Sequence, residues 1–161
     1  MFGFGKKQKE MEVYSPMDGV AIHLEDVPDE AFSEKVLGDG AAVVPCNGNI
    51  YSPVDGEILD ITDTKHAFCI KADGGTEMLL HIGIDTVKLK GEGFKIKIKS
   101  GDIVKAGTKI AEIDLDILEK NGLARHTPVI LTESQNYKIT HVHDGKVTGG
   151  QDVLFLYQKI N

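Results

Sequence analysis

Short runs of apolar residues, separated by turns rich in glycine, fill most of the chain and predict β-strands rather than long helices. The segment 94–99 alternates strictly between apolar residues and lysines, as a strand does when one of its faces is wet. Many short strands linked by frequent turns indicate an antiparallel β-sandwich or a barrel. We expect strands at 19–24, 41–44, 56–61, 67–72, 77–84, 94–99, 108–114, 128–132, 137–142 and 153–159.

Helix signals and an internal repeat complete this pattern. Segment 28–36 begins with a proline, which suits a first helical turn, and segment 116–121 stops at a glycine. The motif Ser-Pro-Met-Asp-Gly at 15–19 recurs as Ser-Pro-Val-Asp-Gly at 52–56, and each copy is a turn that leads into an apolar strand. The repetition predicts two related β-units packed against each other.

The length of 161 residues suggests one domain with a real core. We expect a single all-β domain at 13–161, an antiparallel sandwich or barrel-like fold with a duplicated β-unit and one or two short helices. Residues 1–12 are expected to form a flexible tail, whose two phenylalanines and three lysines allow at most weak contact with an anionic membrane.

Charge and cysteine content narrow the function classes. A net charge of −7 disfavours nucleic acid as a main partner, because phosphate backbones are bound by basic surfaces. No apolar run reaches membrane-spanning length, and the first residues lack the apolar segment of a secretory signal. Cys46 and Cys69 each lie in an apolar run, so we expect buried free thiols and a location in the cytosol.

Among the histidines, His81 has the best local reason to be chemically active. Strand alternation would place it on the face opposite the core, where Gly83 leaves space for a ligand or another chain. A neutral imidazole is nucleophilic near pH 7. On this pattern alone, a histidine that merely sits on a strand is an equally good interpretation. The two expected faces are Met78, Leu80, Ile82 and Ile84 toward the core, and Leu79, His81, Gly83 and Asp85 away from it.

His66 is a second candidate. Alternation would put it on one face with Phe68 and Ile70. If its strand neighbours the strand of His81, the two imidazoles converge, although spacing in the sequence does not decide this.

Three stretches, in order, resemble the glucose-type IIA components of the bacterial sugar phosphotransferase system. Segment 75–87, with its His-Ile-Gly-Ile-Asp-Thr-Val, resembles the signature around the family's phosphorylated histidine, and the match continues through 88–94. Segment 64–68 resembles the stretch with the second active-site histidine, and 25–40 another hallmark stretch. The similarity runs from about Val13 to the C-terminus.

The resemblance implies a phosphoryl relay. The phosphocarrier HPr would donate a phosphoryl group to His81, which would pass it to a cysteine of a sugar-specific IIB domain. His66 would hydrogen-bond the phosphate oxygens, and Thr64 would orient His66. No cofactor is required, and there is no Walker-type loop for ATP.

The resemblance also implies how partners are recognised. The family surrounds its histidines with an apolar disc and a rim of carboxylates. Thr62 departs from the family, because some relatives carry an aromatic residue there. A monomer is expected, with a further role as a phosphorylation-dependent regulator and a zinc ion shared by His66, His81 and a partner carboxylate in one type of complex. The disc candidates are Phe32, Phe68 and Leu79, with Asp29 and Asp85 at the rim.

Two other readings stay open. His81 and Asp85 form a His-x-x-x-Asp pattern and, with His143 of a His-x-His pair, resemble the ligands of lysostaphin-type zinc endopeptidases, although those enzymes need export. Segment 101–107 resembles the hairpins of biotinyl and lipoyl carrier domains but lacks their Met-Lys-Met or Asp-Lys-Ala tripeptide.

Overall fold

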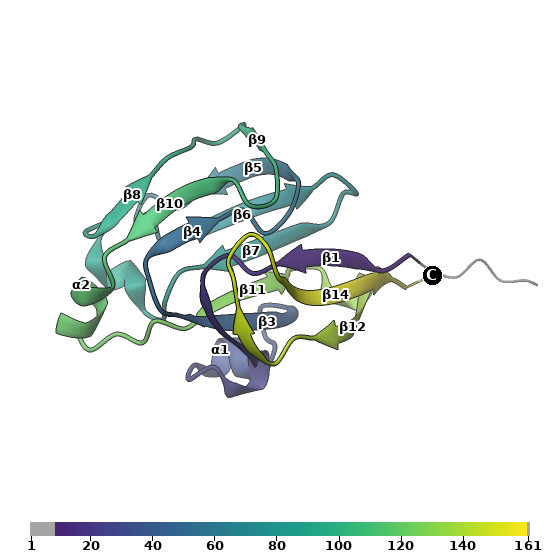
Figure 1. Cartoon of the computed structure of the whole chain (residues 1–161), viewed down its shortest axis with the longest axis horizontal. Coiled ribbons are helices and arrows are strands. Elements are labelled where there is room, and N and C mark those ends of the chain that lie inside the picture. The colour runs from purple at the N-terminus through teal and green to yellow at the C-terminus, as the bar shows by residue number, and fades with distance from the viewer. Residues whose placement is uncertain (1–8, 161) are drawn as a thin grey trace, which may run out of the picture.

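The computed structural model describes residues 9–160, which fold into three antiparallel sheets (Figure 1). The large sheet has the strand order β13 (Gly145–Val147), β2 (Gly19–His23), β3 (Asp39–Pro45), β11 (Thr127–Leu131), β7 (Glu77–His81), β6 (Ala67–Ala72), β5 (Gly56–Ile61) and β9 (Ile103–Val104). One small sheet contains β1 (Met11–Tyr14), β14 (Val153–Lys159) and β12 (Tyr137–Val142). The other contains β4 (Asn49–Tyr51), β10 (Lys109–Ile113) and β8 (Phe94–Ile96).

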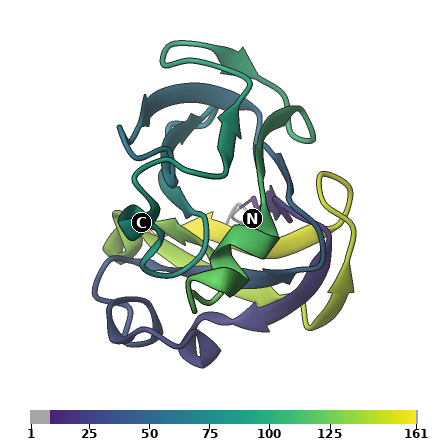
Figure 2. The same cartoon turned by 90° about the vertical axis from the view of Figure 1, so that its left-hand side faces the viewer.

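Helices occupy short connections. Helix α1 (Glu30–Ser33) begins at Asp29, whose carboxylate accepts a hydrogen bond from Ala31 N–H at 2.9 Å, and α2 (Leu115–Lys120) begins at Asp114 in the same way. Three 3₁₀ turns are η1 (Leu24–Asp26), η2 (Thr86–Leu89) and η3 (Ser134–Asn136). Helix α1 lies below β3 in Figure 1, whereas α2 lies at the left-hand end and faces the viewer in Figure 2.

Two hydrophobic clusters cover opposite faces of the large sheet. The main cluster joins all three sheets and includes Phe68 and Leu80 from the large sheet, Phe155 from β14 and Ile110 from β10. The second cluster packs η1 and α1 against the other face, and its members are Leu24, Val27, Phe32, Ala42, Ile84 and Ile130. Strand alternation explains the split, since Ala42 of β3 lies in the second cluster and its neighbours Ala41 and Val43 in the main one.

The repeated motif forms two equivalent corners that hold each other. Ser15 and Ser52 are fully buried, and each hydroxyl donates to the carbonyl two residues later at 2.7 Å. The corners also exchange backbone bonds: Tyr14 N–H donates to Pro53 O, and Tyr51 N–H donates to Pro16 O, both at 2.8 Å. The expected pair of related β-units therefore meets at this point.

The predicted fold class is confirmed, with differences in detail. The strand expected at 77–84 ends at His81 and the one at 94–99 ends at Ile96, while β1, β4, β9 and β13 were not predicted. The expected start of the domain at residue 13 is too late, because Met11 and Glu12 pair with β14. The rest of the expected tail, residues 1–8, lies outside the described residues.

Two further expectations concern cysteines and membranes. Both cysteines are free, but the prediction that they are buried is wrong, since Cys46 and Cys69 are exposed. Cys69 faces the outer side of the sheet because it pairs with Leu79 rather than with a core residue. Within residues 9–160, no helix combines the length and the apolar character needed to cross a membrane.

Candidate functional site

His81 is the last residue of β7, and a tight turn immediately after it holds its ring. The Nδ1 atom of His81 lies 2.8 Å from the carbonyl oxygen of Gly83. A carbonyl only accepts, so Nδ1 carries the proton of the neutral ring and Nε2 keeps its lone pair. Gly83 has a φ of +72°, and a Cβ atom there would lie 2.6 Å from the Thr86 methyl group. The turn therefore requires glycine.

His66 reaches the same place from the loop between β5 and β6. Lys65, just before it, has a φ of +65°, and this left-handed residue breaks the alternation that the sequence analysis assumed. The prediction that His66 shares a face with Phe68 and Ile70 is wrong, because those two side chains lie in the main core. The His66 carbonyl accepts a 2.7 Å hydrogen bond from Ile82 N–H, which ties the loop to the end of β7.

The two imidazoles meet edge to face. Their ring centroids are 4.9 Å apart with an interplanar angle of 78°. On another side, the ring of Phe32 lies 5.1 Å from that of His81 at 60°. The convergence that spacing alone could not decide is therefore present in the structure, and a phenyl ring from α1 borders it.

Two threonine hydroxyls face Nδ1 of His66. Thr64 Oγ1 lies 2.7 Å from this nitrogen, and Thr62 Oγ1 lies 3.3 Å from it. Thr62 also accepts a hydrogen bond from Ala67 N–H at 3.2 Å. A hydroxyl that donates to Nδ1 leaves the ring proton on Nε2. From the sequence, Thr62 stands out only as a departure from the family pattern, and its contact with His66 was not predicted.

Burial controls the charge of both rings. It lowers the pKa of His81 below the ordinary value, and this effect outweighs the Gly83 hydrogen bond and the carboxylates of Asp29 and Asp85, which raise that pKa. The pKa of His66 is lowered by burial first and by the proximity of His81 second. Both imidazoles are therefore neutral at neutral pH, the form in which Nε2 of His81 can act as a nucleophile.

The residues expected around the histidines have different surroundings. Phe68 is fully buried in the main core, so it offers no surface to a partner and its place in the expected disc is wrong. Phe32 is only 4 % exposed and packs in the second cluster. Leu79 and Asp29 are half-buried, and Asp85 is exposed. Alternation in β6 explains Phe68, since it pairs with the core residue Leu80.

Exposed apolar residues that the sequence analysis missed flank the site along the chain. Val36 and Leu37 follow α1 and are 73 % and 44 % exposed. Val87, in η2, is 49 % exposed. Val36 lay at the end of the helix expected at 28–36, and Val87 stands beside Lys88 in a segment with no expected element, so strand periodicity detected neither.

The ligand set of the zinc endopeptidase alternative does not assemble. Across residues 9–160, no group of three His, Cys, Asp or Glu residues is placed to hold a metal ion. Nε2 of His143 instead lies 3.1 Å from the carbonyl of Lys146, beside β13. His66 and His81 supply two nitrogens, so zinc bound between them would take its other ligands from a partner or from water.

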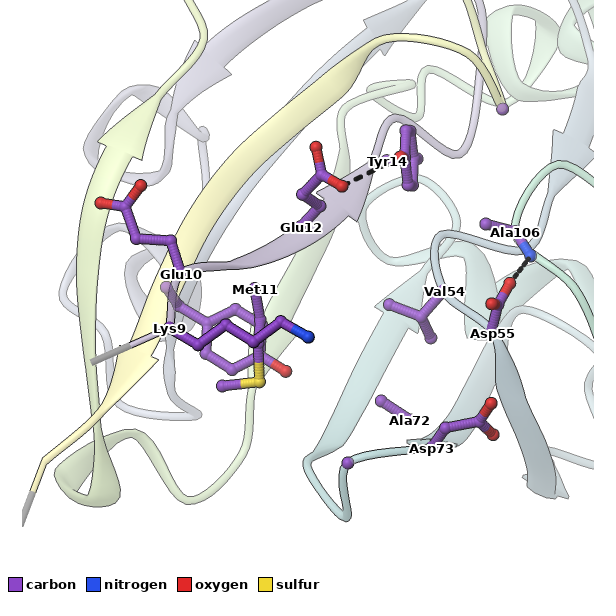
Figure 3. A pocket seen from close by; sticks show the side chains of 13 residues that line it. Lys9, Glu10, Met11, Glu12, Tyr14, Val54, Asp55, Ala72, Asp73 and Ala106 are labelled. Carbon is purple, nitrogen blue, oxygen red and sulfur yellow. Dashed lines mark hydrogen bonds between the residues drawn. The ribbon is translucent and has the colours of Figure 1, made fainter. Parts of the chain in front are cut away.

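An open hollow of about 490 Å³ is lined in part by Ala72 and Asp73, where the chain turns from β6 toward the start of β7 (Figure 3). Its lining includes Tyr14, Asp55 and Asp73, and it contains no histidine or cysteine. Asp55 is already engaged, because its carboxylate accepts a 2.8 Å hydrogen bond from Ala106 N–H. The histidine pair, which lies at the opposite end of β7, is the better candidate for chemistry.

Replacing Gly83 by alanine is predicted to cost more stability than replacing Gly122. Both have similar φ values, +72° and +67°, but nothing lies within 4 Å of a Cβ at Gly122. G122A should cost about 1–2 kcal/mol for the left-handed backbone alone. G83A has the same backbone cost, and the clash with Thr86 should lower its unfolding free energy by about 1–3 kcal/mol more. Urea unfolding of both variants measures the difference, and equal losses would contradict the steric argument.

A second prediction concerns pH. The imidazoles of an unfolded chain have a pKa of about 6.5. The folded pKa values of His66 and His81 are lower, so below this pH the unfolded chain binds more protons and the unfolding free energy falls. The double variant H66Q/H81Q should show a flatter profile in urea unfolding from neutral to acidic pH. His126, whose pKa is also lowered by burial, is present in both proteins. If the unfolding free energies of the wild type and the double variant fell in parallel with pH, the lowered pKa values of His66 and His81 would be refuted.

Comparisons with known proteins point to one family. The family model described as phosphoenolpyruvate-dependent sugar phosphotransferase system, EIIA 1, matches residues 11–137. A protein of Oceanobacillus iheyensis named PTS system glucose-specific EIIA component is 41 % identical over 148 residues, 91 % of this chain and 90 % of that protein. One of the same name from Buchnera aphidicola is 42 % identical and covers 91 % of each chain.

A solved structure resembles the whole fold. Glucose permease IIA from Mycoplasma capricolum superposes with a TM-score of 0.87 at 37 % identity, covering 97 % of this chain and 99 % of that one. The fold and the relatives agree over nearly the entire length and the family model over residues 11–137, and the chain belongs to the EIIA 1 family of the phosphoenolpyruvate-dependent sugar phosphotransferase system.

Proposed function

We propose that the chain accepts a phosphoryl group from phosphorylated HPr on Nε2 of His81 and passes it to a cysteine of a sugar-specific IIB domain. Family membership by itself supports a phosphoryl-transfer role in a sugar phosphotransferase system. The observation that supports His81 as the phosphoryl acceptor is the contact between its Nδ1 atom and the Gly83 carbonyl, beside a second imidazole. That contact leaves Nε2 as the free nucleophilic atom.

The transfer is a pair of balanced displacements. In the first, the lone pair of Nε2 forms a bond to phosphorus, while the bond from phosphorus to the donor breaks and returns its electron pair to the donor. In the second, a thiolate of the acceptor attacks phosphorus, and the pair of the Nε2–P bond returns to His81. The proton stays on Nδ1 of His81 throughout, hydrogen-bonded to the Gly83 carbonyl. Such transfer depends mainly on positioning and on charge stabilisation.

His66, oriented by Thr64, would hydrogen-bond the phosphoryl oxygens. If the Thr64 hydroxyl donates to Nδ1 of His66 across their 2.7 Å contact, the ring proton lies on Nε2 and can be donated to an oxygen of the transferred group. A donor fixed in advance at this point stabilises the charge that develops during transfer. Thr62, at 3.3 Å from the same nitrogen, would support this tautomer.

The partner surface we propose is apolar with acidic groups beside it. Val36, Leu37 and Val87 offer exposed apolar area, in place of the buried Phe68. Asp29 and Asp85 are close enough to His81 to raise its pKa, so they can steer a basic partner toward the ring. Phosphorylation adds about −1.5 to −2 charge at such a centre, which would disfavour an apolar contact and allow regulation. The shared zinc ion, the monomeric state and the cytosolic location stay predictions.

The variant H81A tests the acceptor. Incubated with phosphoenolpyruvate, enzyme I and HPr, the wild-type chain should gain one acid-labile, base-stable phosphate, and H81A should gain none. H23A is the matched control, because His23 is exposed on β2, and it should be labelled normally. Phosphate retained by H81A would refute the assignment of His81.

The variant H66Q tests the second imidazole. We expect it to accept phosphate from HPr but to deliver it poorly to a IIB domain, by about a hundredfold or more, because one fixed donor to the transition state is lost. A chase of labelled H66Q with the acceptor domain measures delivery. Delivery at the wild-type rate would remove His66 from the mechanism.

A further inference from the structure

The turn after His81 is held at each of its backbone polar groups. Two consecutive peptide groups form it, the one between Ile82 and Gly83 and the one between Gly83 and Ile84. In the second group, the Gly83 carbonyl accepts from His81 Nδ1 at 2.8 Å, and Ile84 N–H donates to Ala124 O at 3.0 Å. The orientation of this group decides where the His81 ring points.

Two threonine hydroxyls hold the first peptide group. Thr86 Oγ1 donates to the Ile82 carbonyl, and Thr127 Oγ1 accepts from Gly83 N–H at 3.4 Å. Thr127 also donates its own proton to Arg125 O at 3.0 Å, so its hydroxyl is oriented as an acceptor toward Gly83. Both threonines are fully buried, where water cannot replace either bond.

We propose that Thr86 and Thr127 are positioning residues for His81: by clamping the peptide group between Ile82 and Gly83, they fix the Gly83 carbonyl and so select the Nδ1–H form of the ring. The consequence for catalysis rests on the proposed function, but the effect on the ring does not. Neither threonine touches the reacting atoms.

Glycine makes this clamp necessary. Without a Cβ, Gly83 can rotate its peptide groups among many conformations, and the one seen here lies at φ +72°. A Cβ at Gly83 would lie only 2.6 Å from the methyl group of Thr86. This one side chain therefore packs against the glycine and also donates a hydrogen bond to the peptide group between Ile82 and Gly83. If the carbonyl turned away, the neutral ring could place its proton on Nε2, where it would block attack on phosphorus.

Isosteric variants separate positioning from simple stability. T86V and T127V remove one hydroxyl each and keep the side-chain shape, whereas T86S and T127S keep the hydroxyl. The matched control is T76V, because Thr76 is also fully buried but precedes β7, at the end of the strand away from His81. Alanine at position 86 or 127 removes the hydroxyl without placing a methyl group there, and it gives the same test if a valine variant does not fold.

Nitrogen NMR of the His81 ring, at a pH where it is neutral, reads the tautomer with no partner present. We expect the wild type, both serine variants and T76V to hold the proton on Nδ1, and T86V and T127V to show a substantial Nε2–H population. Phosphate acceptance from HPr should slow by about tenfold to a hundredfold in the valine variants and stay unchanged in T76V.

Folded valine or alanine variants that keep the wild-type tautomer would overturn the inference, whatever their stability. The same holds if T76V shifts the tautomer as much as they do. Failure of the proposed function is distinguishable, because it would show as a wild-type chain that accepts no phosphate while its tautomer still responds to the threonine variants.

Discussion

The hydrogen bond from His81 Nδ1 to the Gly83 carbonyl is the constraint on which the candidate site depends. It decides which nitrogen carries the proton and which is free to react. Its acceptor is placed there because the chain leaves β7 through a left-handed glycine two residues after the histidine. A two-residue extension of the strand would have pointed that carbonyl toward a neighbouring strand instead, and the ring would have lost its fixed orientation.

Opposing effects on the pKa of His81 act around this bond. Phe32 and the second hydrophobic cluster shield one side of His81, which lowers its pKa, while the carboxylates of Asp29 and Asp85 act in the opposite direction. The net result is an uncharged ring that lies beside a second uncharged imidazole, that of His66. Neutral groups with fixed dipoles would suit the proposed relay, in which the site holds a dianionic phosphoryl group and releases it again.

Strand periodicity predicted the parts of the fold that are regular. Segments with several alternating residues, such as 67–72 and 137–142, became strands with those bounds, whereas strands as short as β9 or β13 leave too few residues for a pattern. The site was less predictable, because it is made at strand ends. Lys65 and Gly83 have left-handed backbones, and each one reversed a face assigned by alternation, that of His66 and that of Ile84. The resemblance to a family, rather than alternation, paired the two histidines.

The duplicated corners have a consequence for how the molecule holds together. Each Ser-Pro-x-Asp-Gly segment supplies the carbonyl that the other segment's tyrosine amide requires, so neither half has a complete set of partners by itself. Opening one corner leaves an unpaired backbone amide in the other corner. The free-energy cost of opening one half is therefore also borne by the other half. The domain is thus built like a dimer closed within a single chain, and we expect its two halves to loosen together rather than in separate steps.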